Sequence, residues 1–191
     1  MNVIAGTYKG RTIPFSNRKF NNADITPQKL KGALFSILGE DLTGKSFLDL
    51  YACSGQVGIE AVSRGASFVL FNELNKKRYS FIKNLLEEWE CDSIARVLSM
   101  PAGRCIRYVS GQEYEFDNIF CDPPYEKVRE KSVRYKMILR EISEARILKQ
   151  DGIVVVQHFG KSIVPEKAGD LALVNTRKYG SNSLSEYILQ K

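Results

Sequence analysis

An apolar run that leads through a turn of small residues into a helix is the feature that most constrains the fold. Residues 46–61 read Ser-Phe-Leu-Asp-Leu-Tyr-Ala-Cys-Ser-Gly-Gln-Val-Gly-Ile-Glu-Ala. The opening residues predict a buried strand, and Gly55 and Gly58 predict a tight strand–helix junction. Glycine at these places lets the backbone approach a ligand and lets the helix pack closely on the sheet. The segment therefore favours an α/β fold with a ligand site at this turn.

The same alternation of strand and helix continues along the chain. The expected strands are 46–50, 67–72, 95–99, 117–121 and 152–158, and the expected helices are 56–64, 75–90 and 130–149. In the helix 75–90, a buried apolar stripe is expected, which makes Trp89 a core residue and not a platform for base stacking; its members are Phe81, Ile82, Leu85, Leu86 and Trp89. A further helix is expected after Thr26, with Thr26 as its cap, Pro27 as its first residue and Gly39 at its end. This alternation favours parallel pairing, with ligands bound beyond the carboxyl ends of the strands.

The two ends of the chain have a different pattern. Residues 3–15 alternate around Lys9-Gly10 and predict an N-terminal β-hairpin, whereas 171–175 and 184–189 predict a final antiparallel pair joined through Gly180. We therefore expect a Rossmann-like α/β sheet, mostly parallel with an antiparallel last strand. With 191 residues the chain is expected to form one domain, 1–191, in which 1–25 supply the hairpin and a loop.

Acidic residues stand where three of these strands end. Asp49 ends the first strand, Glu73 follows the second, and Asp122 opens the tetrad Asp122-Pro123-Pro124-Tyr125 after the fourth. An acid in the place of Glu73 can bind the two ribose hydroxyls of an adenosyl ligand. Glu73 can equally act as a carboxylate beside a helix N-terminus.

The Asp122 tetrad suits the binding of a planar amine. Asp122 can accept a hydrogen bond from the amine, the prolines lack backbone donors and leave their carbonyls as acceptors, and Tyr125 offers a ring for stacking. Such a slot would hold an exocyclic base nitrogen with its lone pair directed at an electrophile. A simple turn after a strand is the alternative interpretation of the tetrad alone.

Taken in this order, the motifs resemble those of class I S-adenosylmethionine (SAM)-dependent methyltransferases that act on exocyclic amines. More narrowly, the chain resembles bacterial 16S rRNA guanine-N2 methyltransferases of the RsmD type. Beyond the three sites above, the similarity includes the opening Val3–Arg11, the helix 33–38 and the closing Arg177–Gly180. It extends over nearly the whole chain.

The resemblance implies an enzyme that transfers the methyl group of SAM to guanine N2, after the base is flipped out of its RNA stack. The implied catalytic residues are Asp122, Pro123, Pro124 and Tyr125. The implied cofactor-binding residues are Asp49, Tyr51, Ala52, Cys53, Ser54, Gly55, Gly58, Glu73, Leu74 and Ala102. The implied RNA-binding residues are Lys9, Arg11, Thr26, Lys127 and Arg129. The expected partner is rRNA, either free or within an assembling small ribosomal subunit, and the expected state is a monomer.

Some positions depart from the family pattern and keep alternatives open. Cys53 stands where the family has glycine, and Pro101 stands where it has an Asp or Asn for the adenine. These two departures suggest, as one alternative, a non-catalytic RNA-binding module that has lost SAM. An adenine-N6 methyltransferase acting on DNA or RNA is a second alternative, because the tetrad also serves that amine. A nicotinamide oxidoreductase is a third, disfavoured by the missing first glycine.

Composition agrees with a polyanionic partner. The net charge is +6, and basic residues gather in two groups. The first group is Lys9, Arg11, Arg18, Lys19, Lys29 and Lys31, and the second is Lys127, Arg129, Lys131, Arg134 and Lys136. A solvated surface is the alternative interpretation of either group.

The remaining composition points away from metals and membranes. The four cysteines have no metal-ligand spacing and are expected to be buried thiols, and His158 is expected to be structural. The start of the chain has no signal-peptide pattern, so a cytoplasmic protein is expected.

Overall fold

The computed structural model describes residues 1–20, 26–124 and 132–190, apart from the side chains of Asn17, Lys19 and Ser132. Tyr125, Lys127, Arg129 and Lys131 lie outside the described residues. The chain forms two compact units, Met1–Met100 and Pro101–Lys191, called here the first and the second unit.

The first unit contains a parallel sheet in the order β3-β2-β1. Its strands are β1 (Ser46–Asp49), β2 (Phe68–Asn72) and β3 (Ala95–Leu98), and its helices are η1 (Asn17–Phe20), α1 (Gln28–Leu38), α2 (Gln56–Ser63) and α3 (Lys76–Glu88). Phe47, Leu48, Leu70 and Phe71 are at most 1% exposed, because strands covered by helices are apolar on both faces. The three strands and the helices α2 and α3 confirm the sequence prediction.

Helix α3 shows why this part of the chain was predictable. Asn75 caps it, since its Oδ1 accepts hydrogen bonds from the backbone N–H of Lys77 (3.0 Å) and Arg78 (3.2 Å). Its apolar stripe packs inward, and Trp89, which follows the helix, is 4% exposed. The expectation that Trp89 is a core residue is confirmed.

Helix α1 begins differently from the prediction. It runs over Gln28–Leu38, the residue in the cap position is Pro27 and not Thr26, and no side chain caps it. Gly39 ends the helix as expected, with a φ of 104°. The predicted cap is wrong because Thr26 is drawn inward: it is 8% exposed and its carbonyl accepts a hydrogen bond from Gln56 Nε2 (2.6 Å).

The N-terminal segment folds back on itself, but not as a regular β-hairpin. Its two arms meet in one isolated antiparallel bridge, Asn2 to Thr12, and hydrogen bonds such as Val3 N to Arg11 O (3.0 Å) join them. The arms are drawn instead to helix α2. The Glu60 carboxylate, which is fully buried, accepts hydrogen bonds from the backbone N–H of Ile4 (2.8 Å) and Ala5 (3.0 Å).

The same carboxylate holds two buried cations. Lys31 Nζ lies 3.1 Å from Glu60 Oε2, and Arg64 Nε lies 3.0 Å from Glu60 Oε1. Lys31 is 0% exposed, so its assignment to the basic surface group is wrong. A buried charge needs partners of this kind, because an unpaired one costs several kcal/mol in a low-dielectric interior. Glu60 therefore joins α1, α2 and the N-terminal segment.

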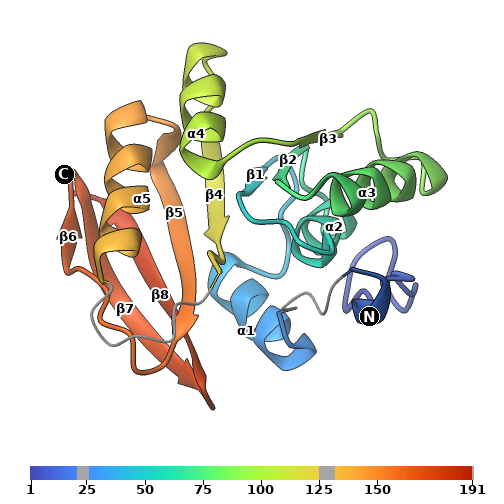
Figure 1. The fold of residues 1–191 in the computed structure, drawn as a ribbon, viewed down its shortest axis with the longest axis horizontal. Helices are drawn as coiled ribbons and strands as arrows, with labels where there is room; N and C mark the ends of the chain where they lie inside the picture. Colours follow the sequence, from blue (N-terminus) through green and yellow to red (C-terminus); the bar gives the residue numbers. More distant parts are fainter. Residues whose placement is uncertain (21–25, 125–131, 191) are drawn as a thin grey trace. The chain divides into compact units, whose positions relative to one another are not determined.

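The second unit contains the strands in the order β4-β5-β8-β7-β6. Its strands are β4 (Phe116–Cys121), β5 (Leu148–Phe159), β6 (Lys167–Ala168), β7 (Leu171–Tyr179) and β8 (Asn182–Leu189), and its helices are α4 (Ala102–Gly111) and α5 (Ser132–Ala145). Strands β4 and β5 pair in parallel, and β8 lies antiparallel between β5 and β7. The antiparallel last strand confirms the prediction. In Figure 1, α5 lies along this sheet, in contact with β5, β6 and β7.

Two features of this unit differ from the prediction. Helix α4 was not expected, because it has only three buried residues and packs on α5. The β7–β8 hairpin is longer than expected and reaches Tyr179 and Asn182, with a two-residue turn at Gly180-Ser181. Gly180 has a φ of 63°, which a tight hairpin turn requires.

Candidate nucleotide-cofactor loop and amine slot

The turn after β1 is shaped by a buried acid. Asp49 is 1% exposed, and its Oδ2 accepts a hydrogen bond from the backbone N–H of Gly58 (3.0 Å) at the start of α2. Its Oδ1 has no hydrogen-bond partner among the described residues. Burial, opposed by the Gly58 hydrogen bond and aided by the nearby Glu73 carboxylate, raises the pKa of Asp49 to about 7. Asp49 is thus a carboxyl group that changes charge near neutral pH while it supports the turn.

The glycines of the turn have different tasks. A Cβ on Gly58 would lie 2.2 Å from the Phe71 ring, so Gly58 is required for α2 to pack on β2. Gly55, at the cap position of α2, has a φ of 75°, and no side chain caps the helix there. At the start of α2 the Gly58 N–H is taken by Asp49, and the N–H groups before it have no side-chain cap. A helix start of this kind can bind a negatively charged ligand group.

Cys53 adopts the backbone conformation that a glycine would take more easily. Its φ is 50°, in the left-handed region. The thiol is half-buried and lies 3.6 Å from Arg78 Nη1 on α3. Cys53 therefore holds, with a side chain, the left-handed conformation that glycine adopts at lower cost.

Glu73 links this turn to α3. The residue is 7% exposed. Its Oε2 accepts a hydrogen bond from Cys53 N (2.8 Å) and lies 3.8 Å from Arg78 Nη1, whereas Oε1 accepts from Asn75 N (2.7 Å). A carboxylate has about four lone-pair positions, so hydroxyl donors can still be accepted. Both interpretations of Glu73, ligand acceptor and carboxylate at a helix N-terminus, are compatible with these contacts.

The other predicted cofactor residues differ in exposure. Leu74 is 61% exposed and can cover a flat apolar ligand, whereas Ala52 is 5% and Ser54 1% exposed. The Ser54 hydroxyl contacts Met1 Sδ (3.8 Å) and points away from solvent. Tyr51 is half-buried. Ala102, in the second unit, is half-buried at the first position of α4.

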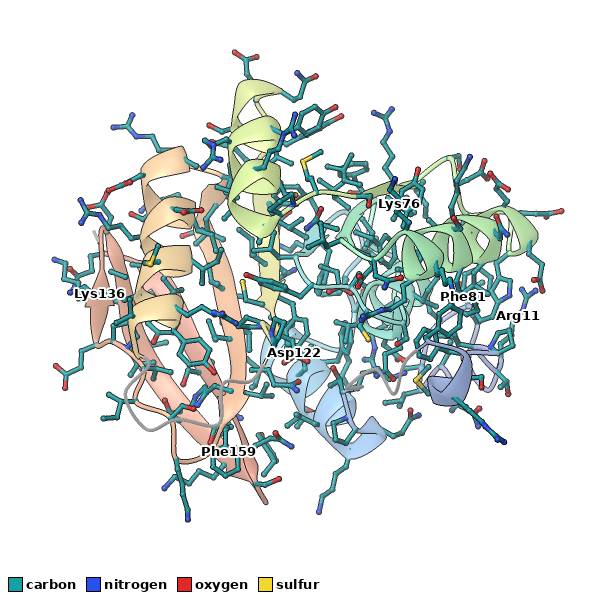
Figure 2. The ribbon with its side chains drawn as sticks, viewed as in Figure 1. Arg11, Lys76, Phe81, Asp122, Lys136 and Phe159 are labelled. Atoms are coloured by element: carbon teal, nitrogen blue, oxygen red, sulfur yellow. The ribbon has the colours of Figure 1, made fainter. Side chains whose placement is uncertain are left out.

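The tetrad follows β4, and the structure describes three of its residues. Asp122 is half-buried, Pro123 is buried and Pro124 is exposed. Arg134, on α5, donates a hydrogen bond from Nη1 to the Pro124 carbonyl (3.1 Å). This bond fixes the backbone beside Asp122, which is labelled in Figure 2. Arg134 was predicted only as part of a basic group, and its contact with the tetrad could not be read from the sequence.

Two predicted RNA contacts lie in the N-terminal segment; both are exposed, and one of them packs on aromatic residues. Lys9 is exposed in the turn. Arg11 is also exposed, but its guanidinium lies 4.1 Å from the centre of the Trp89 ring, and Tyr8 donates a hydrogen bond to the Trp89 carbonyl (3.0 Å). Arg11 is therefore held against aromatic residues. Figure 2 shows Arg11 and Phe81 in this region; Phe81 meets Phe15 and Phe20 edge-on.

A pocket of about 460 Å³ lies in the first unit, lined by Met1, Asn2, Thr26, Pro27, Gln28 and Gln56. Gln56 is 2% exposed, and its Oε1 has no hydrogen-bond partner among the described residues. Gln56 was not expected at a functional site, because a glutamine after a glycine gives no signal of its own. Thr26 keeps little exposed surface for an RNA contact.

His158 and the cysteines have structural surroundings. His158 is 2% exposed, and burial lowers its pKa. Cys91, Cys105 and Cys121 are buried as expected, whereas Cys53 is only half-buried, because it lies in the turn after β1. Within residues 1–20, 26–124 and 132–190, no group of three or more His, Cys, Asp or Glu side chains is arranged to hold a metal ion. In the same part of the chain, no helix has the length and apolar character to cross a bilayer.

Comparison with known proteins agrees with the geometry. A Bacillus subtilis protein named "Putative rRNA methyltransferase YlbH" is 33% identical over 98% of both chains. "Ribosomal RNA small subunit methyltransferase D" of Buchnera aphidicola subsp. Baizongia pistaciae is 30% identical and matches 81% of this chain and 74% of its own.

Solved structures share the fold. The structure named "putative methylase HI0767" from Haemophilus influenzae has a TM-score of 0.78 and 23% sequence identity, and the match covers 100% of this chain and 99% of its own. An RNA methyltransferase of Salinibacter ruber in complex with S-adenosylhomocysteine has a TM-score of 0.63 and 13% sequence identity, and the match covers 88% of this chain and 95% of its own. These similarities confirm the expected methyltransferase-type α/β fold.

The family described as Conserved hypothetical protein 95 matches residues 1–188. With the relatives above, this match confirms the resemblance drawn from the sequence: the chain belongs to the Conserved hypothetical protein 95 family.

Proposed function

We propose that this protein transfers the methyl group of SAM to the exocyclic N2 of a guanine in 16S rRNA. The Asp122-Pro123-Pro124 backbone, held by Arg134 after a buried strand, is the observation that carries the proposal. The names of the relatives support rRNA as the substrate class. The choice of guanine N2 rests on the tetrad and on the resemblance of the whole chain.

The residues of the first unit suit SAM as the methyl donor. The uncapped start of α2 suits the carboxylate of the methionine part, the Glu73 carboxylate suits the ribose hydroxyls, and the exposed Leu74 suits one face of the adenine. When bound, SAM supplies an electrophilic methyl group on a sulfonium. The proposal assigns binding and orientation of this group to the β1–α2 turn.

The residues of the second unit suit the amine acceptor. Asp122 accepts a hydrogen bond from an N–H of the amine and raises the electron density on its nitrogen. The new C–N bond forms as the C–S bond to the methyl group breaks, and the cofactor leaves as the neutral thioether. The Pro123 carbonyl can accept a hydrogen bond from the second N–H, because a proline offers an acceptor and no donor. After transfer, the nitrogen loses one proton to Asp122 or to water. Positioning of the two reactants supplies much of the acceleration.

The experiment is a methylation assay on unmodified 16S rRNA made by transcription and on small subunits reconstituted with it. The product nucleoside is identified by mass spectrometry, and binding of SAM and of NADH is measured by calorimetry. Asp122→Asn should lower kcat by about 10²- to 10⁴-fold with intact SAM affinity. Asp170→Asn, an exposed acid of the same unit, should leave it unchanged.

Each alternative gives a different product. Detection of N6-methyladenosine as the product would show that the protein is an adenine-N6 methyltransferase and not a guanine-N2 methyltransferase. RNA binding without SAM binding would establish the non-catalytic module, and binding of NADH alone would favour the oxidoreductase. Near-normal turnover by Asp122→Asn would remove Asp122 from the amine site.

A further inference from the structure

Two aromatic residues share one cross-strand row at the end of the second unit. Asn182 on β8 pairs with Phe159 on β5 and with Tyr179 on β7. Directly paired residues project from the same face of a sheet, so the two rings flank Asn182 on one face. Phe159 is 42% exposed and Tyr179 is half-buried. Arg177, two residues before Tyr179, projects from this same face.

Hydrogen bonds tie the backbone at this end of the row. The Phe159 carbonyl accepts hydrogen bonds from Ser162 N (2.8 Å) and from His158 Nδ1 (2.9 Å). Since a carbonyl only accepts, His158 carries its proton on Nδ1, and its Nε2 accepts from the Ser185 hydroxyl (2.8 Å). Gly160 N donates to Ser181 O (2.8 Å), which ties the end of β5 to the hairpin turn.

The charge of this end suits a polyanion. Residues 157–163 and 175–184 contain Lys161, Arg177 and Lys178 and no Asp or Glu. Arg177 Nε lies 3.0 Å from Glu186 Oε1, and the Arg177 side chain remains 47% exposed. This ion pair places the guanidinium beside Glu186, on the face that carries the rings.

The row lies at the same end of the sheet as the tetrad. Strands β4 and β5 are parallel, and Cys121 is level with Val156. Asp122 follows Cys121 directly, whereas Phe159 lies three residues beyond Val156. At roughly 3.3 Å per residue, this places Phe159 about 10 Å farther along the strand direction than Val156. Figure 2 shows Asp122 and Phe159 at the end to which β4 and β5 point.

We propose that Phe159, Tyr179 and Arg177 form an RNA-binding platform that receives bases next to the methylated nucleotide. Exposed aromatic residues on a sheet face stack with unpaired bases, and a guanidinium beside them binds phosphate or stacks in turn. The platform rests on the proposed function, because the substrate is RNA. It extends the RNA contacts beyond Lys9 and Arg11 to the unit that carries Asp122.

The experiment compares the double variant Phe159→Ala/Tyr179→Ala with Ile188→Ala, a control residue on β8 that is 40% exposed at the other end of the hairpin. The substrates are unmodified 16S rRNA transcript and reconstituted small subunits. The double variant should raise the KM for RNA and the Kd of the transcript by roughly tenfold or more, with kcat and SAM affinity little changed. The conservative pair Phe159→Tyr/Tyr179→Phe should restore both values.

The slope of the logarithm of the RNA-binding constant against the logarithm of the salt concentration separates stacking contacts from phosphate contacts. The double variant should keep the wild-type slope, whereas Arg177→Gln should lower it by up to about one phosphate contact. Equal KM and Kd in the double variant and in Ile188→Ala would overturn the platform. A loss seen only with subunits would also overturn it, and would assign the surface to a ribosomal protein.

Failure of the platform and failure of the proposed function are distinguishable. If wild-type protein binds the transcript without methylating it and the double variant loses this affinity, the platform stands and the proposed function does not. If the double variant methylates guanine N2 with a normal KM, the proposed function stands and the platform does not. Circular dichroism and the unfolding midpoint of each variant verify its fold.

Discussion

Removal of the buried Glu60 carboxylate should be among the most destabilising changes in the first unit. The fully buried carboxylate is shared by Lys31 Nζ (3.1 Å), Arg64 Nε (3.0 Å) and the backbone N–H groups of Ile4 and Ala5 (2.8 and 3.0 Å). Breaking a buried ion pair costs about 3–5 kcal/mol, and a buried N–H without a partner costs about 1–3 kcal/mol. These costs overlap, so we expect Glu60→Ala to lower the free energy of unfolding by about 5 kcal/mol.

A loss of this size approaches the entire stability of many domains, about 5–15 kcal/mol. Glu60→Gln is therefore the variant to measure. Glutamine keeps one acceptor oxygen, but its amide NH2 faces donors and cations. We therefore expect Glu60→Gln to lower the free energy of unfolding by about 3 kcal/mol. Lys31→Met removes one of the two cations beside the carboxylate and the hydrogen bond from Lys31 Nζ to the Asn2 carbonyl (2.9 Å), whereas Arg64 stays paired with Glu60. Burial already lowers the pKa of Lys31, more than Glu60 raises it, so this variant should lose about 1 kcal/mol or less.

Urea unfolding, followed by the fluorescence of Trp89, the one tryptophan of the chain, gives these free energies by linear extrapolation. Glu87→Gln is the control, because Glu87 and its partner Lys83 are more than half exposed, and should change stability by less than about 0.5 kcal/mol. A cost below about 1 kcal/mol for Glu60→Gln, or an equal cost for Lys31→Met, would refute the central role of the carboxylate.

Two further predictions concern the cofactor turn. Burial raises the pKa of Asp49 to about 7 in the folded protein, so its contribution to stability is fully present below about pH 4 and is lost as the pH rises through 7. Asp49→Asn, which cannot ionise, should remove up to about 4 kcal/mol of this pH dependence, measured by urea unfolding from pH 4 to 8. At Cys53, whose φ is 50°, Cys53→Val should cost about 2 kcal/mol and Cys53→Gly less than about 1 kcal/mol.

Parallel pH profiles of wild-type protein and Asp49→Asn would show that the buried carboxyl is not the titrating group. Equal stabilities of Cys53→Val and Cys53→Gly would show that the turn relaxes around a β-branched residue, so that the left-handed conformation carries no cost.

Regular elements with strong local signals were predictable from the sequence. The stripe of α3, with Asn75 as its cap, gave the helix and the burial of Trp89, and the strands near Asp49 and Glu73 appear where expected. Weak local signals failed. The arms of the N-terminal segment pair in only one bridge because Glu60, 55 or more residues away, binds the backbone of Ile4 and Ala5. Thr26 lost its capping role to a contact with Gln56.

The sequence by itself determined the order of strand, turn and helix and the chemical types of the residues at the strand ends, because these depend on local periodicity and on residue identity. The tertiary structure alone decided what surrounds each group. It buried Lys31, which composition had placed on a basic surface, and brought Glu73 to the Cys53 backbone. It also aligned Phe159 with Tyr179 through Asn182. Such contacts join residues 20 or more positions apart, and strand register and helix packing set them, which no local pattern encodes.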